Sequence, residues 1–170
     1  DFKLLLTSAK KTFDSGFLEN AIIEYEKLSI KYSTNAIVFY NLGLIYKSNE
    51  EYKLAVENYV IAQNLNPFEI KYEKAVKVVS QIIAQNGDIN YRRQDFDLAI
   101  KNYNEAITYY PEYTIAIFKL ARTYYRQNDL DNALITLKKG LMIDPDQEQN
   151  EKMIGDIYRK NDNQEEAINH

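Results

Sequence analysis

The chain has 170 residues, of which 45% are hydrophobic and 27% charged, a balance that suits one folded domain and contains no apolar run near the roughly 18 residues of a membrane-spanning helix. Its net charge of −4 and isoelectric point near 5.2 argue against a nucleic-acid-binding protein, which uses a basic face to neutralise phosphates. The absence of cysteine excludes disulfides and thiolate zinc sites, and it leaves cytoplasmic and periplasmic localisation both allowed.

The N-terminal part of the chain carries two helical stretches. Apolar residues at helical spacing predict helices over about 2–15 and 18–31, and Ser15 and Gly16 separate them. Asn35 then precedes the next apolar stretch, and asparagine is a preferred residue at the start of a helix. We therefore expect a first pair of helices.

The stretch 36–69 repeats this arrangement in its clearest form. One apolar stripe marks a first helix, a second stripe with two alanines marks the next, and a proline ends it. The two stripes predict helices that pack against each other. Their members are Phe39, Leu42, Gly43 and Tyr46 in the first helix, Ala55, Tyr59 and Ala62 in the second, and Pro67 after it.

An insertion follows this pair. Ten extra residues, 70–79, separate Pro67 from the next repeat, and neither glycine nor proline interrupts residues 68–86. Because helical spacing continues through the insertion, we expect one overlong helix over about 69–94.

The repeat after the insertion has an unusual first helix. Asn86 and Asn90 stand where the pattern has leucine and tyrosine, in a seam that is normally apolar. We expect local rearrangement there, with Ile89 or Tyr91 turned inward, or a water-filled gap. Two interpretations stay open, a hinge between two lobes and a rigid stack with one polar patch.

Small residues recur at fixed distances along the chain. Two independent series both show spacings of 34, 44, 34 and 34 residues, so the repeat does not depend on one chance match. The expected units are 2–35, 36–69, 80–113, 114–147 and a partial unit over 148–170, whose second helix would cover Gln164–His170. The two series are Ala21, Ala55, Ala99, Ala133 and Ala167, and Ala9, Gly43, Gly87, Ala121 and Gly155.

This pattern resembles the tetratricopeptide repeat, whose unit is about 34 residues long, with Phe39 in place of the usual tryptophan. The resemblance implies an all-α, right-handed superhelical solenoid of antiparallel helix pairs, forming a single repeat domain over 1–170. The sequence begins at Asp1 and ends inside an expected helix, so we expect a segment of a longer protein.

The sequence contains few residues that could act in catalysis. Its one histidine, His170, is the last residue, and it has no cysteine, no glycine-rich phosphate loop and no metal-binding motif. The acidic pairs at 50–51 and 165–166 fall in expected turns, where solvated carboxylates are ordinary. We expect no enzyme, no cofactor and no metal.

The aromatic residues divide into two groups. Pattern positions predict that six tyrosines pack the helix seams: Tyr25, Tyr46, Tyr59, Tyr103, Tyr124 and Tyr158. Other side chains lie at positions that the resemblance places on a concave groove, which binds a peptide or helix of a partner protein. The candidate contact residues are Tyr40, Leu44, Lys47, Asp88, Tyr91, Arg92, Phe118, Arg122, Tyr125, Arg126 and Arg159.

Arginine is confined to the first helices of the third to fifth units. Because its planar guanidinium suits bidentate capture of carboxylates, an acidic partner segment follows as a hypothesis. The alternative is an internal charge ladder, in which Asp88 and Asp156 pair with neighbouring arginines.

The resulting functional hypothesis is a protein–protein interaction scaffold that uses mainly its second to fourth units. Capture of a chaperone tail is disfavoured, because of the five positions that the resemblance assigns to it only Asn41 agrees. Two alternatives remain: a structural module that self-associates through the long helix or the repeat ends, and an accessory domain of a larger enzyme.

Overall fold

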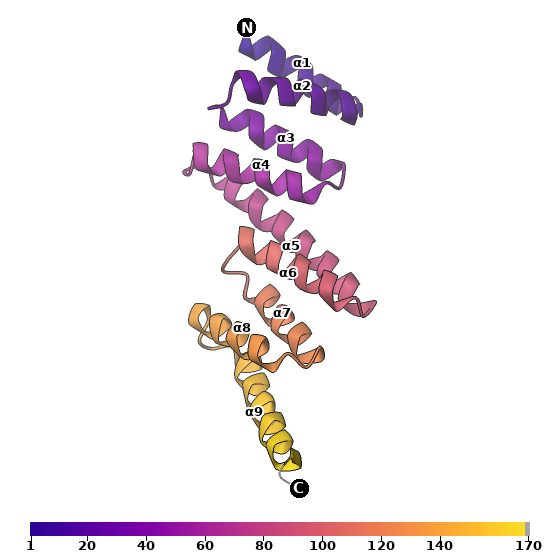
Figure 1. The fold of residues 1–170 in the computed structure, drawn as a ribbon. Coiled ribbons are helices and arrows are strands. Elements are labelled where there is room, and N and C mark those ends of the chain that lie inside the picture. Colours follow the sequence, from indigo (N-terminus) through magenta and orange to yellow (C-terminus); the bar gives the residue numbers. More distant parts are fainter. Residues whose placement is uncertain (169–170) are drawn as a thin grey trace. The chain divides into compact units, whose positions relative to one another are not determined.

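The structure, a computed structural model, describes the backbone of residues 1–168 and the side chains of residues 1–161. This part of the chain contains helices and no strand, which confirms the all-α fold (Figure 1). None of the described helices combines the length and the apolarity needed to cross a membrane. The helices are α1 (Phe2–Asp14), α2 (Leu18–Lys31), α3 (Ala36–Ser48), α4 (Tyr52–Leu65), α5 (Ile70–Arg92), α6 (Phe96–Tyr109), α7 (Thr114–Arg126), α8 (Leu130–Ile143) and α9 (Glu148–Ile168).

The chain forms two compact units, which divide between Ile82 and Ile83 inside α5. In unit 1, α1 packs on α2, α2 on α3 and α3 on α4. In unit 2, α6 packs on α7, α7 on α8 and α8 on α9, and α7 also touches α9. Each of these contacts joins helices that are neighbours, or next neighbours, in sequence, as helix repeats require. The bounds of the single repeat units stay predictions.

The expected overlong helix corresponds to α5, which has 23 residues where α1 to α4 have 13 or 14. Polar side chains occupy part of its seam, since Asn86 and Asn90 are both half-buried. The inward turn expected of Ile89 is wrong, because this side chain is 40% exposed. Tyr91 is half-buried and meets Phe96 edge to face, with ring centres 5.5 Å apart.

A left-handed residue ends the first helix of each complete pair. Gly16, Glu50, Gln94 and Asn128 have φ values of 82°, 60°, 63° and 63°, in a region that residues other than glycine adopt rarely. These positions follow the same spacing as the alanine series, so the backbone repeats with the sequence. In α9 the helix continues without a turn to Ile168, where a break before Gln164 was expected, and the side chain of Ala167 and all of His170 lie outside the described residues.

The seam of each complete pair is built on small residues. Ala21, Ala55, Ala99 and Ala133 are all fully buried, as their spacing predicted. A Cβ on Gly43 would lie 2.6 Å from the Tyr59 ring, and one on Gly87 would lie 2.7 Å from the Tyr103 ring, closer than real contacts allow. Only glycine therefore lets these two buried tyrosines approach the facing helix.

The fifth repeat departs from this seam. Tyr158 was expected to be packed, but its side chain is 48% exposed. No described atom lies within 4 Å of a Cβ built on Gly155, because no following helix covers this face of α9 in the described part of the chain. The opposite face is packed, since Ile157 is fully buried in the core with Ala121 and Leu137.

Candidate partner-binding surfaces

Two basic pockets, one in each unit, contain most of the candidate contact residues. The first, which we call the lysine groove, has a volume of about 250 Å³, and the second, the arginine pocket, about 470 Å³. In the part of the chain that the structure describes, no carboxylate lines either pocket. The lysine groove is lined by Tyr40, Leu44, Lys47, Tyr59, Lys71, Lys74, Ala75 and Val78, and the arginine pocket by Tyr91, Arg92, Gln94, Phe96 and Arg126.

The floor of the lysine groove is aromatic. The ring of Tyr40 lies 5.6 Å from that of Tyr59 and 5.1 Å from that of Tyr72, measured between centres. The Lys71 ammonium is 5.4 Å from the centre of the Tyr40 ring and 5.1 Å from that of Tyr72, within cation–π range. It also pairs with Glu69 at 3.7 Å, so its charge is partly neutralised.

The other two lysines of the groove keep their full charge. Lys47 follows Tyr40 and Leu44 on the same face of α3, because residues four and three apart share a face. Neither Lys47 nor Lys74 pairs with a carboxylate of the described residues. The groove thus combines an aromatic and aliphatic floor with unpaired positive charge.

The arginine pocket is organised around Tyr91, near the end of α5. The Arg122 guanidinium carbon lies 4.7 Å from the centre of its ring, and Nε of Arg126 donates to its hydroxyl at 3.3 Å. This hydrogen bond raises the pKa of Arg126. Its guanidinium is charged at neutral pH in any case. Nε of Arg92 donates to the backbone carbonyl of Asp88 at 3.3 Å. We call Arg92, Arg122 and Arg126 the arginine cluster.

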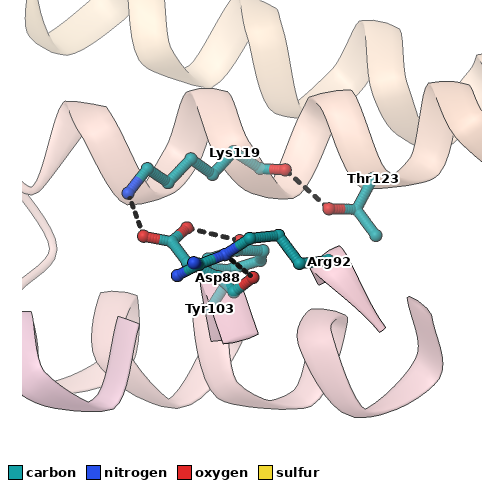
Figure 2. A network of polar contacts seen from close by, with 5 residues as sticks. All are labelled: Asp88, Arg92, Tyr103, Lys119 and Thr123. Atoms are coloured by element: carbon teal, nitrogen blue, oxygen red, sulfur yellow. Dashed lines mark hydrogen bonds and ion pairs between the residues drawn. The ribbon is translucent and has the colours of Figure 1, made fainter. Parts of the chain in front are cut away.

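The Asp88 carboxylate bonds to side chains of α6 and α7 and not to the arginine cluster (Figure 2). Its Oδ1 accepts from the Tyr103 hydroxyl at 2.7 Å, and its Oδ2 pairs with the Lys119 ammonium at 2.6 Å. The side chains of Asp88 and Lys119 are each only 24% exposed. Thr123 is fully buried, and its hydroxyl donates to the Lys119 carbonyl at 2.7 Å. Asp88 therefore links α5, α6 and α7.

Burial changes the titration of the tyrosines beneath these surfaces. It raises the pKa of Tyr59 and of Tyr103 well above the ordinary tyrosine value, and the hydrogen bond to Asp88 raises that of Tyr103 further. Both hydroxyls are therefore protonated at neutral pH, and the Tyr103 hydroxyl can donate to a carboxylate.

The structure separates the candidate residues into groups. Tyr40, Leu44 and Lys47 meet in unit 1, and Tyr91, Arg92 and Arg126 meet in unit 2, where Arg122 covers the Tyr91 ring. The other four candidates make their contacts outside the two pockets. Asp88 bonds to Tyr103 and Lys119. Phe118 and Tyr125 pack against the core of unit 2, and Arg159 pairs with Asp156.

Sequence reasoning missed several residues of the two pockets. Lys71 and Lys74 lie in the insertion, where the repeat pattern assigns no position to them. Gln94 lies in the turn before α6 and Phe96 is the first residue of α6, and the groove positions of first helices include neither. The charge ladder is only partly right: Arg159 pairs with Asp156, but Asp88 pairs with Lys119.

Metal ligands do not gather on these surfaces. Within the described residues, no group of three or more His, Cys, Asp or Glu side chains is placed to hold a metal ion.

Comparison with known proteins adds the family. Two family models, both described as tetratricopeptide repeat, match residues 36–68 and 91–151, together more than half of the chain. No curated protein sequence matches it.

The chain is also similar to solved structures. MamA 41-end from Desulfovibrio magneticus RS-1 is 16% identical with a TM-score of 0.45, over 99% of this chain and 90% of that chain. The first TPR domain of human RPAP3 is 18% identical with a TM-score of 0.47, over 77% and 95%. YrrB, described as a TPR protein with an unusual peptide-binding site, is 19% identical with a TM-score of 0.43, over 90% and 91%. These values are too low to transfer a ligand.

Proposed function

Because this chain belongs to the tetratricopeptide repeat family of protein–protein interaction scaffolds, we propose that it captures an acidic segment of a partner protein. The observation that supports an acidic segment best is the pair of guanidinium groups at Tyr91. Arg122 and Arg126 both contact this ring or its hydroxyl, and neither pairs with a carboxylate of the described residues. Their charges are available to an acidic ligand.

The composition of the two pockets supports the same proposal. The chain as a whole is acidic, with 25 Asp and Glu against 21 Lys and Arg, yet the linings of the lysine groove and the arginine pocket contain only cations among their charged residues. Such a local excess attracts an acidic partner and fixes its position more than it raises the total affinity. The aromatic and aliphatic side chains beside the cations then offer apolar contacts to the same segment.

A charge-reversal experiment tests the proposal. The probe is a fluorescein-labelled peptide in which glutamate and leucine alternate, and binding is measured by fluorescence anisotropy at low salt. The double variant R122E/R126E should bind this peptide about tenfold more weakly or worse. The same peptide with lysine in place of glutamate should not bind the unmodified chain.

A matched control excludes a general charge effect. The double variant K138E/K139E makes the same change in net charge on the exposed side of α8, which lines neither pocket, and should keep its affinity within about threefold. Circular dichroism and thermal melting must show that both variants fold. Equal losses in the two variants, or no binding of the acidic peptide, would contradict the proposal.

Self-association is a second candidate function, because one face of α9 is open. Among the described residues, nothing lies within 4 Å of a Cβ built on Gly155, and the Tyr158 side chain is half exposed. A second copy that covers this face would bury both residues. Sedimentation velocity over a wide concentration range tests this function: Tyr158→Lys should lower the association constant, and a chain that is monomeric at every concentration would exclude it.

A further inference from the structure

The arginine cluster has more hydrogen-bond donors than the protein satisfies. Each guanidinium carries five N–H groups. Among the described residues, the acceptors are the Asp88 carbonyl for Arg92 and the Tyr91 hydroxyl for Arg126, each used by one Nε. Nε of Arg122 is buried and has no acceptor at all. The remaining N–H groups of Arg92 and Arg126, the two arginines that line the arginine pocket, are left for a ligand rich in acceptor oxygens.

The carboxylates near the cluster are already engaged. Asp88 holds Lys119 and Tyr103, Asp97 accepts from the Gln127 amide at 2.8 Å, and Asp95 caps α6 by accepting from the Leu98 N–H at 3.2 Å. None of the three pairs with an arginine of the cluster. Asp88, Asp95 and Asp97 therefore do not neutralise the charge of the three guanidinium groups.

The positions of these arginines are also restrained. Arg122 is half-buried and stacks on Tyr91, Tyr91 packs edge to face on Phe96, and Arg126 is hydrogen-bonded to the Tyr91 hydroxyl. A restrained guanidinium loses less entropy when it binds than a free lysine does. The lysine groove differs in this respect, since Lys47 and Lys74 carry point charges on flexible side chains, and among the described residues neither makes a cation–π contact or an ion pair.

A single carboxylate can accept from one guanidinium fork, with one negative charge and two oxygens. A phosphorylated side chain carries about −1.5 to −2 charges at neutral pH and three strong acceptor oxygens. It therefore matches the two guanidinium groups that line the pocket, those of Arg92 and Arg126, with Arg122 beside them on the Tyr91 ring, better than a carboxylate does. We propose that the arginine pocket reads a phosphorylated side chain within the acidic partner segment, an inference that rests on the proposed function.

Three labelled peptides test this inference with the full chain. They share the alternating glutamate and leucine sequence and differ at one central position, which is serine, glutamate or phosphoserine. The phosphoserine peptide should bind at least about tenfold more tightly than the glutamate peptide, since it adds a charge-assisted hydrogen bond or more. Inorganic phosphate at concentrations equal to the peptide should not displace it.

The double variant R122K/R126K separates geometry from charge, because it keeps both positive charges and removes the planar forks. It should lose the preference for phosphoserine, so that the phosphoserine and glutamate peptides bind this variant with affinities within about threefold of each other. The double variant K138R/K139R is the control and should keep the preference.

The outcomes distinguish this inference from the proposed function. If the glutamate peptide binds and phosphorylation adds less than about twofold, the inference is wrong and the acidic scaffold stands. A preference that survives in R122K/R126K, or displacement by equal inorganic phosphate, also overturns it. If only the phosphoserine peptide binds, the inference stands and capture of unmodified acidic segments is wrong. If none of the three binds, both are wrong.

Discussion

The same repeat position has opposite roles in the two units. Leu44 in α3 and Asp88 in α5 are 44 residues apart, which is one repeat plus the insertion. In unit 1 this position is aliphatic and lines the lysine groove, whereas in unit 2 it is a carboxylate held by Tyr103 and Lys119. The repeat register thus decides which positions meet, and the residue type decides whether they form an apolar floor or a polar network.

The tyrosine hydroxyls show the same contrast. In unit 1, the Tyr25 hydroxyl accepts from the Asn41 amide at 3.2 Å, and no described side chain or backbone group bonds the Tyr59 hydroxyl. In unit 2, the Tyr103 hydroxyl donates to Asp88, which Lys119 neutralises. Three buried rings of equal shape therefore have three polar environments, and substitutions can measure the difference.

The largest effect is expected where the two units are alike. Gly43→Ala and Gly87→Ala would each push a methyl group into a buried tyrosine ring, so each should lower the free energy of unfolding by about 1–3 kcal/mol. Gly155→Ala is the control, because nothing lies within 4 Å of its Cβ, and it should stabilise by up to about 1 kcal/mol. Urea unfolding followed by circular dichroism measures all three, and equal effects would show that the seams are not close-packed.

A smaller effect should separate the two units. Tyr103→Phe removes a hydrogen bond to the Asp88 carboxylate and should cost about 1–2 kcal/mol of unfolding free energy. Tyr59→Phe removes a hydroxyl without a protein partner and should stay within about 0.5 kcal/mol of the unmodified chain. Chemical denaturation at neutral pH decides this, and identical costs would mean that the Asp88 network adds nothing to the stability of unit 2.

At high pH the two tyrosines should behave alike again. Burial raises the pKa of both in the folded state, so their contribution to stability is complete below the ordinary tyrosine pKa near 10 and is lost as pH rises above it. The urea concentration at the midpoint of unfolding should therefore decrease from pH 8 to pH 11. This fall should be smaller in the double variant Tyr59→Phe with Tyr103→Phe, and an unchanged fall would assign it to other groups.

The smallest expected effect concerns both pockets mutated together. It is the difference between the loss of binding free energy in the combined variant and the sum of the losses in the two double variants. K47E/K74E should weaken binding of the glutamate peptide, as R122E/R126E does, and the two pairs share no contacts. In the combined variant the losses in binding free energy should add to within about 0.5 kcal/mol if one segment uses both pockets independently. Anisotropy titrations measure this sum. If the second pair has no effect once the first is reversed, only one pocket binds the peptide.

The seams could be predicted from the sequence because they depend on local and periodic features. A small residue in one helix and a ring in the next recur at constant distance, and burial of Ala55, Ala99 and Tyr103 followed. The boundary between α1 and α2 and the start of α3 followed as well, since the turn at Gly16 and the cap Asn35 are short-range signals, whereas the break expected before Gln164 in α9 did not.

The binding surfaces were predicted less completely, for physical reasons. Lys71 and Lys74 belong to the insertion, which no repeat pattern describes. The contact of Arg122 with Tyr91 depends on how α5 and α7 pack, and side-chain stacking across helices leaves no periodic signal. Tyr158 shows the converse, because the pattern marks it as packed and the partner surface is missing from the described chain.

The glycine–tyrosine contact also bears on which substitutions a repeat of this chain can tolerate. In the fourth repeat, the positions of Gly43 and Tyr59 are occupied by Ala121 and Leu137, which are both fully buried in one core cluster. The protein therefore packs this pair of positions in two ways. In the second repeat a glycine faces a tyrosine ring, and in the fourth repeat an alanine and a leucine take the two positions. Grafting alanine and leucine together into the second repeat should be tolerated where the single exchange is not, which makes the pair, and not the residue, the unit of sequence variation.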